Sequence, residues 1–116
     1  YYIDLILKRT HTLSMTLRKS SSHAILKHCD EVSSMLKSLS HPVRLKILCH
    51  IMESERTVNE LTEFCSISQS SMSQFLTRMK EEGLLQSRRE GTFMKYDIAD
   101  ARLKKLLRAL KEIYCP

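Results

Sequence analysis

The segment 66–80 carries apolar residues at the spacing that a helix brings onto one face. Those at positions i, i+3, i+4 and i+7 are Met72, Phe75, Leu76 and Met79. They form one stripe, which predicts an amphipathic helix packed on a core. The opposite face carries hydrogen-bonding side chains, namely Gln69, Ser70, Ser71, Ser73, Gln74, Thr77 and Arg78. Taken alone, this segment also fits a solvated surface helix without a partner.

The residues before this helix favour a helix-turn-helix motif. Thr57 and Glu60 have the spacing of a capping box, which predicts a short helix over 58–64. A three-residue turn then leads to Ser68, a good N-cap for the next helix. In such a motif the second helix enters the major groove of DNA, where short polar side chains meet phosphates and base edges. The residues predicted to contact DNA from this helix are Ser68, Gln69, Ser70, Ser71, Ser73, Gln74, Thr77 and Arg78.

A small hairpin is predicted directly after this helix. Gly83 favours a helix end, and strands are predicted over 85–89 and 92–98 around a tight Glu90-Gly91 connection. A hairpin beside a recognition helix is placed to reach phosphates or the minor groove. The basic residues predicted to do so are Arg88, Arg89 and Lys95. The alternative is an ordinary basic surface hairpin.

The remaining helices are predicted at the two ends of the domain. One covers 24–39, a second runs from Pro42 to about Met52, and a last one follows Asp100 as its N-cap. The last helix is too apolar on one face to stay exposed on a small domain, so a partner helix is expected. Its residues predicted to form a dimer interface are Leu103, Leu106, Leu107, Leu110 and Tyr114. The predicted fold is mainly α with a small β-hairpin, a winged helix-turn-helix dimeric through its first and last helices.

Length and charge narrow the class of protein. The chain has 116 residues and a net charge of +6, so we expect one domain with a polyanionic partner. That domain is predicted over 23–116 after a flexible extension at 1–22, in which Met15 is the expected natural start. No apolar run is long enough to predict a membrane span. A chain of this composition is expected to be soluble.

Four cysteines without a CxxC pair, and no secretory signal, favour reduced thiols in the cytoplasm. The sequence has no cofactor motif and no catalytic constellation, so an enzyme is not expected. A thiol oxidoreductase is a remote alternative. No cofactor and no metal site is predicted.

Several motifs, in this order, resemble the ArsR family of winged-helix repressors. They are LSHPVRLKIL at 39–48, VNEL at 58–61, SQSSMSQFL at 68–76, GLL at 83–85 and REG at 89–91. The resemblance covers about residues 24–116. It implies a homodimer that binds an inverted-repeat DNA operator and releases it when a chemical inducer is sensed.

The sequence lacks the motifs with which members of this family usually bind a metal inducer. Members that bind metal near the recognition helix use a cysteine pair, and the corresponding run here, residues 60–65, holds only Cys65. Members that bind zinc through the last helix use histidine ligands, and the last predicted helix contains none. A repressor responding to a metal held by other cysteines, or to an unknown inducer, remains the alternative.

Cys49 and Cys115 instead resemble the two thiols of the persulfide-responsive BigR/SqrR-type branch of this family. That resemblance implies redox sensing, in which a reactive sulfur species or another oxidant bridges the two thiols and the operator is released. The alternative is that Cys49 is a small core residue and Cys115 a terminal one without a role. Cys29 and Cys65 match neither thiol and are expected to be structural.

Overall fold

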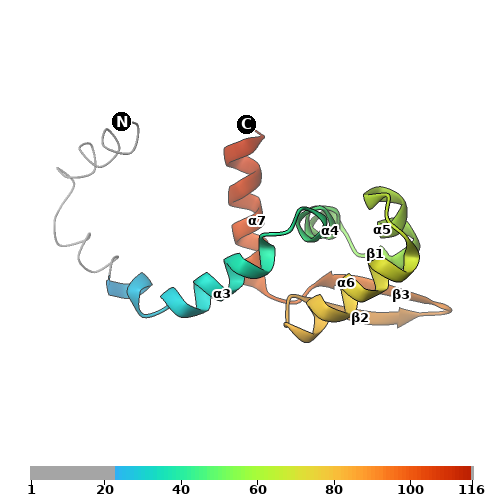
Figure 1. The fold of residues 1–116 in the computed structure, drawn as a ribbon, viewed down its shortest axis with the longest axis horizontal. Helices are drawn as coiled ribbons and strands as arrows, with labels where there is room; N and C mark the ends of the chain where they lie inside the picture. The colour runs from blue at the N-terminus through green and yellow to red at the C-terminus, as the bar shows by residue number, and fades with distance from the viewer. Residues whose placement is uncertain (1–22, 116) are drawn as a thin grey trace. The chain divides into compact units, whose positions relative to one another are not determined.

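The structure, a computed structural model, describes residues 23–115 and is mainly helical with one small antiparallel sheet (Figure 1). It divides into two units, and the boundary along the chain falls between Ser38 and Leu39. The helices are α3 (Cys29–Leu39), α4 (Pro42–Glu53), α5 (Val58–Cys65), α6 (Gln69–Glu81) and α7 (Ala101–Tyr114), and the strands are β1 (Arg56–Thr57), β2 (Leu85–Glu90) and β3 (Phe93–Ile98). The predicted extension at 1–22 lies outside the described residues, as does Pro116. The predicted mainly helical class with a hairpin is confirmed.

The first described helix starts later than predicted. The expected start was Ala24, but α3 begins at Cys29, after a separate helical turn at 23–26. Asp30 and Glu31 lie in the first turn of α3, where negative charge interacts favourably with the helix dipole. This local charge favours a new helix start over a continuous helix.

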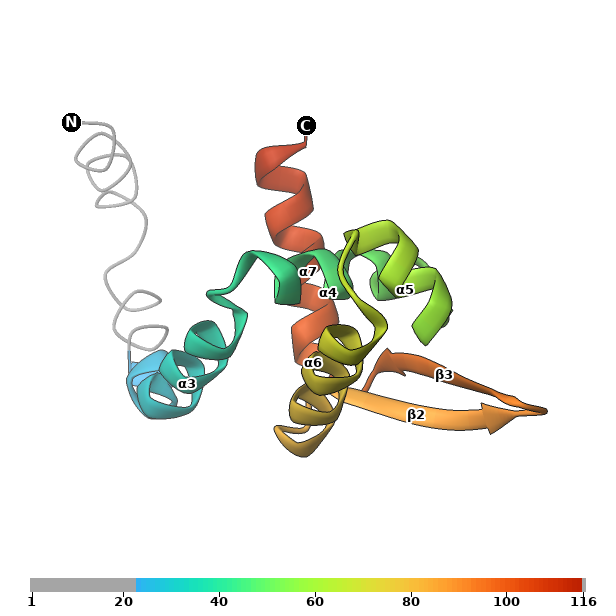
Figure 2. The same cartoon turned by 45° about the vertical axis from the view of Figure 1, so that its right-hand side comes forward.

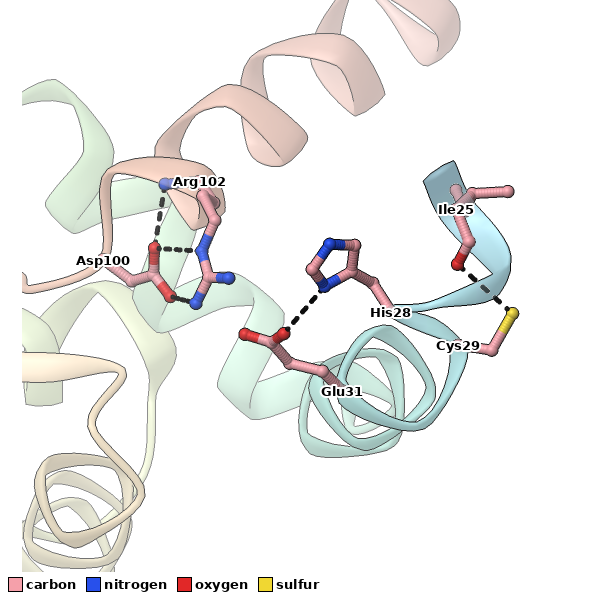
Figure 3. Close-up of polar contacts among 6 residues, drawn as sticks. All are labelled: Ile25, His28, Cys29, Glu31, Asp100 and Arg102. Atoms are coloured by element: carbon pink, nitrogen blue, oxygen red, sulfur yellow. Dashed lines mark hydrogen bonds and ion pairs between the residues drawn. The ribbon is translucent and has the colours of Figure 1, made fainter. Parts of the chain in front are cut away.

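Local contacts surround this start (Figure 3). The Cys29 thiol donates a hydrogen bond to the Ile25 carbonyl at 3.5 Å, and His28 Nδ1 lies 3.4 Å from the Glu31 carboxylate. The large apolar residues that remain exposed here are Ile25, Leu26, Val32 and Leu36. Helix α3 therefore keeps an exposed apolar face.

Helix α4 is central to the core of the second unit, in contact with α5, α7 and β3. Helix α6 packs on α5 and β2, and of its predicted stripe Met72, Leu76 and Met79 are buried while Phe75 is half-buried. The fully buried side chains are Ile47, Leu48, Ile51, Leu61, Met72, Leu76, Met79 and Leu103. The predicted packing face of the recognition helix is therefore confirmed.

The helix-turn-helix has the predicted ends. The Thr57 hydroxyl accepts from the Glu60 amide, while the Glu60 carboxylate accepts from the Thr57 amide, each at 3.2 Å. The Ser68 hydroxyl accepts from the Ser71 amide at 3.2 Å and caps α6. After α6, Gly83 has a φ of 80°, a conformation that glycine adopts without steric cost.

The helices α4 and α7 are capped by side chains as well. His41 Nδ1 accepts from the Val43 amide at 3.2 Å, and Pro42 takes the first position of α4, where no amide is needed. Asp100 accepts from the backbone and side chain of Arg102 at the start of α7 (Figure 3). These hydrogen bonds hold the pKa of Asp100 below its ordinary value.

The wing is a hairpin with a register one residue away from the prediction. Glu90 pairs with Phe93, so Gly91 and Thr92 form the two-residue loop in place of the expected Glu90-Gly91. Gly91 has a φ of 62°, which suits the first central position of such a loop. A short strand, β1, adds to the far edge of β3 in the order β1-β3-β2. A strand of two residues is too short for its alternation to be read from sequence.

The ribbons of α4 and α6 can be followed in Figure 2. Two side-chain contacts connect the start of α4 with α6. Arg44 Nη1 lies 2.6 Å from a carboxylate oxygen of Glu82, the C-cap of α6. The Arg44 side chain is 10% exposed and that of Glu82 37%. The His41 ring lies 5.1 Å from the ring of Phe75. The recognition helix is therefore held at two points by residues at one end of α4.

Candidate functional site

The outward face of α6 is polar and accessible. All residues of α6 predicted to contact DNA are exposed except Ser71, which is half-buried. A shallow depression of about 340 Å³ on this face is lined by Ser73, Gln74, Thr77, Arg78 and Glu81. Glu81, at the end of this row, carries a negative charge that would repel a phosphate. Sequence-reading contacts are therefore expected from the first three turns of α6.

The hydroxyls at the start of α6 bond to one another. Ser68 Oγ lies 2.9 Å from Ser71 Oγ and 3.3 Å from Ser70 Oγ. Within residues 23–115, no side-chain hydrogen bond engages Gln69, Ser73, Gln74, Thr77 or Arg78. The serine cluster therefore shapes the helix start, and the uncommitted donors and acceptors lie further along α6.

The basic residues of the wing are not equivalent. Arg88 Nη2 lies 2.7 Å from Glu55 and 3.1 Å from Glu90, and Lys95 Nζ lies 2.9 Å from Glu90. The hydrogen bond and charge of Lys95, with the charge of Arg88, hold the pKa of Glu90 below its ordinary value. Arg89 makes no ion pair with any described residue. Of the three predicted phosphate contacts, Arg89 alone is immediately available.

One residue that the sequence did not single out orients the wing against the recognition helix. Lys80, in the last turn of α6, donates to the Ser87 hydroxyl of β2 at 2.6 Å. This hydrogen bond joins a helix to a strand, so the helical pattern of α6 alone could not predict it. Helix α6 and the wing are therefore tied directly to each other.

Cys49 and Cys115 line the same pocket, between α4 and α7. The pocket has a volume of about 580 Å³. Its walls are formed by Leu45, Cys49, Met52, Glu53, Leu107, Leu110, Lys111, Tyr114 and Cys115. Two thiols that are far apart in sequence thus face one apolar space. That is the arrangement a thiol pair needs before it can be bridged.

The ionisation of Cys49 responds to this pocket. Cys49 exposes part of its surface, but the pocket walls still desolvate its sulfur, and this burial raises the pKa of the thiol. The charges of Cys115 and Glu53 raise that pKa further, whereas the ammonium of Lys111 lowers it. The ammonium of Lys46, three residues before Cys49, acts on Cys65 and lowers the pKa of that thiol.

The other cysteines have different surroundings. Cys65 is buried at the end of α5, and burial raises the pKa of its thiol. Cys29 is exposed in α3 and bonds to its own helical turn. The alternative of Cys49 as a core residue is wrong, because Cys49 is exposed.

The five α7 residues predicted to form a dimer interface do not share one environment. Leu103 is 0% and Leu107 3% exposed, because both pack in the core of their own chain. This corrects the prediction for these two residues, since neither has surface to offer a partner. Leu106 and Leu110 are half-buried, and Tyr114 is 79% exposed. Only these three remain as candidate interface residues.

Two general properties of residues 23–115 bear on the class of protein. None of their helices is both long and apolar enough to cross a membrane. No three of their His, Cys, Asp or Glu side chains are grouped so as to hold a metal ion.

Comparison with known proteins identifies the family. Residues 41–87 match the family described as bacterial regulatory protein, arsR family. The HTH-type transcriptional regulator YgaV of Escherichia coli (strain K12) is 39% identical over 88 residues, which cover 75% of this chain and 89% of YgaV. The chain belongs to the ArsR family. The biofilm growth-associated repressor of Xylella fastidiosa (strain Temecula1) is 38% identical over 89 residues, covering 77% of this chain and 78% of that repressor.

Solved structures agree with this assignment. The crystal structure of the repressor BigR from Xylella fastidiosa has a TM-score of 0.76 at 36% identity, covering 82% of this chain and 97% of BigR. The solution structure of Mb0332 from Mycobacterium bovis, described as a homodimeric winged helix-turn-helix DNA-binding domain, has a TM-score of 0.65 at 29% identity, covering 79% of this chain and 82% of that one. This ArsR-family chain is therefore a DNA-binding regulator of the repressor type and not an enzyme. The winged helix-turn-helix prediction is confirmed.

The unequal pairing of the wing charges predicts opposite effects of neighbouring substitutions on DNA binding. Arg89→Ala should weaken binding to operator and random duplexes alike and lower the salt slope by about one, because a phosphate contact is lost. Glu90→Gln should strengthen binding, because it frees Lys95 from its ion pair and removes a negative charge, whereas Arg88 keeps its contact with Glu55. Fluorescence anisotropy over a salt series measures both effects.

Gln74→Ala is the matched control on α6. It should change the preference among operator sequences more than the binding to random DNA, because base contacts carry specificity. Equal losses on operator and random duplexes for Arg89→Ala and Gln74→Ala would contradict this division of roles.

The environment of Cys49 predicts how its reactivity changes with charge. Only the thiolate is nucleophilic, so a raised pKa slows alkylation at neutral pH and moves its rise to higher pH. Glu53→Gln should speed the alkylation of Cys49 by iodoacetamide, and Lys111→Gln should slow it. Mass spectrometry of the peptide containing Cys49 over a pH series measures both rates, and the same rate for both variants at pH 7 would refute the assignment.

Proposed function

We propose that this chain is a repressor that holds its operator while Cys49 and Cys115 are reduced and releases it when reactive sulfur species bridge them. The observation that carries the proposal is the pocket that both thiols line, between α4 and α7. The family match supports the DNA-binding part of it. Reduced thiols of this kind suit a cytoplasmic protein.

The chemistry requires two thiols and one sulfane-sulfur donor. A thiolate attacks the outer sulfur of a hydropersulfide R–S–SH, forming a protein persulfide and expelling R–S⁻, which takes up a proton. The second thiolate attacks the inner sulfur of that persulfide, and hydrogen sulfide leaves as the protein disulfide forms. Both cysteines are oxidised, and the sulfane sulfur is the atom that is reduced.

The bridge would reach the recognition helix through α4. A covalent link between Cys49 and Cys115 restrains α4 against α7. At its other end α4 holds α6 through the Arg44–Glu82 ion pair and the contact of His41 with Phe75. A small shift of α4 therefore moves the reading face. Allosteric coupling of this kind typically amounts to about 1–3 kcal/mol, or roughly five- to 150-fold in affinity.

In a homodimer, a shift of α4 would change how the protein fits its operator. Two recognition helices must match two half-sites of an inverted repeat, so their spacing decides operator affinity. The exposed apolar residues of α3 supply surface for a partner subunit, and so, separately, do Leu106, Leu110 and Tyr114 of α7. The homodimeric structure of Mb0332 supports this assembly.

A metal or another inducer is the second candidate. Two cysteines in one pocket also supply soft ligands for a metal ion, with further ligands from a partner subunit. The thiol reaction is favoured because residues 23–115 of one chain hold no cluster of three metal ligands.

The thiol switch predicts a pattern among serine variants. Sodium tetrasulfide should lower the operator affinity of the wild type, by roughly five- to 150-fold. Cys49→Ser and Cys115→Ser should each stay bound, because neither can form the bridge. Cys65→Ser should respond like the wild type, because Cys65 is buried away from this pocket. Anisotropy and intact mass on the same samples report release and bridging together.

The switch would be contradicted if both single variants released the operator on treatment. The same holds if mass spectrometry found no link between the peptides of Cys49 and Cys115. Release by a divalent metal alone in the reduced wild type would favour the second candidate.

The dimer predicts different outcomes for two adjacent leucines. Leu106→Asp should leave the chain folded but monomeric, because Leu106 is only half-buried in its own chain and a charge there would oppose packing on the proposed partner. Leu107→Asp should unfold the chain, because it puts a charge into the core. Analytical ultracentrifugation and circular dichroism separate the two results. A monomeric wild type at micromolar concentration would exclude the dimer.

A further inference from the structure

We infer that Phe93, at the tip of the wing, enters the minor groove of DNA and disfavours G·C base pairs there. The inference extends the DNA binding that the family match supports, and it does not depend on the thiol switch. Phe93 was not among the predicted DNA contacts, which are all polar or basic. It is a contact of a different kind, because an apolar side chain reads the shape and the base edges of a groove.

Phe93 is exposed at the end of the hairpin. It begins β3 directly after the Gly91-Thr92 loop, and 56% of its surface is exposed. A single exposed aromatic residue is ordinary on a protein surface, so its position carries the argument. The other large apolar residues that are exposed within residues 23–115 all lie in helical segments. Phe93 is therefore the exposed apolar group that the wing presents.

Side-chain contacts fix the wing on both of its faces near the root. Successive residues of a strand point to opposite faces, so Ser87 and Arg88 of β2 lie on different faces. Ser87 accepts from Lys80 of α6 at 2.6 Å, and Arg88 Nη2 lies 2.7 Å from the Glu55 carboxylate. The direction of the hairpin relative to α6 is therefore set before DNA binds. A tip that is already placed loses less conformational freedom on binding.

The length of the hairpin matches the spacing between grooves. Strand β2 has six residues, which at roughly 3.3 Å per residue cover about 17–20 Å. A turn of DNA is about 34 Å long, so neighbouring major and minor grooves lie roughly half of that apart. The root of the wing contacts α6, and Figure 1 and Figure 2 show the hairpin extending away from α5 and α6. With α6 in the major groove, the tip therefore reaches the adjacent minor groove.

The charges around Phe93 suit a nucleic acid. Glu90, which pairs with Phe93 across the hairpin, is held by Lys95 at 2.9 Å and by Arg88 at 3.1 Å. The carboxylate next to the ring is thereby neutralised and repels phosphates less. Arg89 lies on the opposite face of the hairpin and makes no ion pair with any described residue. A protein partner is less suited, because one ring supplies far less surface than a stable protein interface buries.

An aromatic ring distinguishes base pairs by its edge. The minor groove is about 6 Å wide, which admits the ring edge-on. The edge of the ring is electropositive, so it meets the acceptors on the floor of A·T pairs favourably. A G·C pair adds an amino donor in the minor groove, which opposes the ring edge and loses water without gaining an acceptor. Phe93 should therefore favour A·T over G·C pairs beneath the tip.

The first test measures the apolar contact on the reduced, full chain. The probe is the duplex that the wild type selects from a random DNA library. Phe93→Ala should weaken binding about tenfold, because the buried ring surface is lost, and should leave the salt slope unchanged. Phe64→Ala is the matched control, because it removes another exposed phenylalanine, on α5, and should not change binding. Unchanged binding by Phe93→Ala, or a salt slope lowered by about one, would overturn the inference.

Hydroxyl-radical cleavage of the same duplex reports which minor-groove sugars are covered. The wild type should protect a minor-groove segment beside each half-site that Phe93→Ala leaves open. If both proteins protect the same sugars, the ring does not enter the groove and the inference fails.

The second test changes the bases of that segment to A·T, G·C or inosine·cytosine pairs. Inosine lacks the amino group of guanine, so its pair with cytosine has the minor-groove pattern of A·T and the major-groove pattern of G·C. The wild type should bind the A·T and inosine duplexes alike and the G·C duplex about fivefold more weakly.

Two variants separate the ring from the rest of the wing in this second test. Phe93→Ala should bind all three duplexes alike, and so should Phe93→Leu, which keeps an apolar side chain without an aromatic edge. Phe93→Leu should also bind more tightly than Phe93→Ala, because it still buries apolar surface. The inference would be overturned by a preference that persists in both variants, by a wild type that binds all three duplexes alike, or by an inosine duplex that binds like G·C.

Discussion

The packing of helix α4 is the constraint on which both functional surfaces depend. Ile47, Leu48 and Ile51 are at most 1% exposed, so one face of α4 is fixed in the core against its neighbours. Interiors packed this densely respond to a push by moving as units and not by deforming smoothly. The same helix carries Cys49 on its exposed side and Arg44 at its start. The thiol of the proposed switch and the helix proposed to read DNA are thereby attached to one rigid element.

The Arg44–Glu82 ion pair suits positioning better than stabilisation. Glu82 is about one-third exposed, so solvent screens much of the attraction, and the desolvation of Arg44 offsets more of it. Its distance of 2.6 Å nevertheless joins the start of α4 to the C-cap of α6 in one geometry. The contact of His41 with Phe75 adds a second point, so α6 cannot rotate about the first alone. Rearranging this ion pair would therefore change the stability of the folded chain only slightly, as the proposed switch requires.

Sequence alone predicted what is local and left out what joins distant segments. The stripe of α6, its cap at Ser68 and the turn at Gly83 follow from spacing and backbone preference, and each is confirmed. The start of α3 was wrong because apolar periodicity continues through a break set by local charge. The Glu55–Arg88 pair joins residues far apart in the chain, so no window of sequence contains it. For the same reason an apolar helix face does not reveal whether it packs on its own chain or on a partner, as Leu107 showed.

The raised pKa of Cys49 and the apolar pocket have linked consequences for the proposed thiol switch. A thiol that is mostly protonated at neutral pH reacts slowly with small oxidants that meet it only by diffusion. A donor held in the pocket stays next to the sulfur, so a small thiolate fraction is sufficient for reaction. Lys111 raises that fraction, while Glu53 and the thiolate of Cys115 limit it. The same surroundings that slow general oxidation would therefore favour donors that the pocket retains, so the proposed switch would gain its selectivity from residence in the pocket more than from intrinsic thiol reactivity.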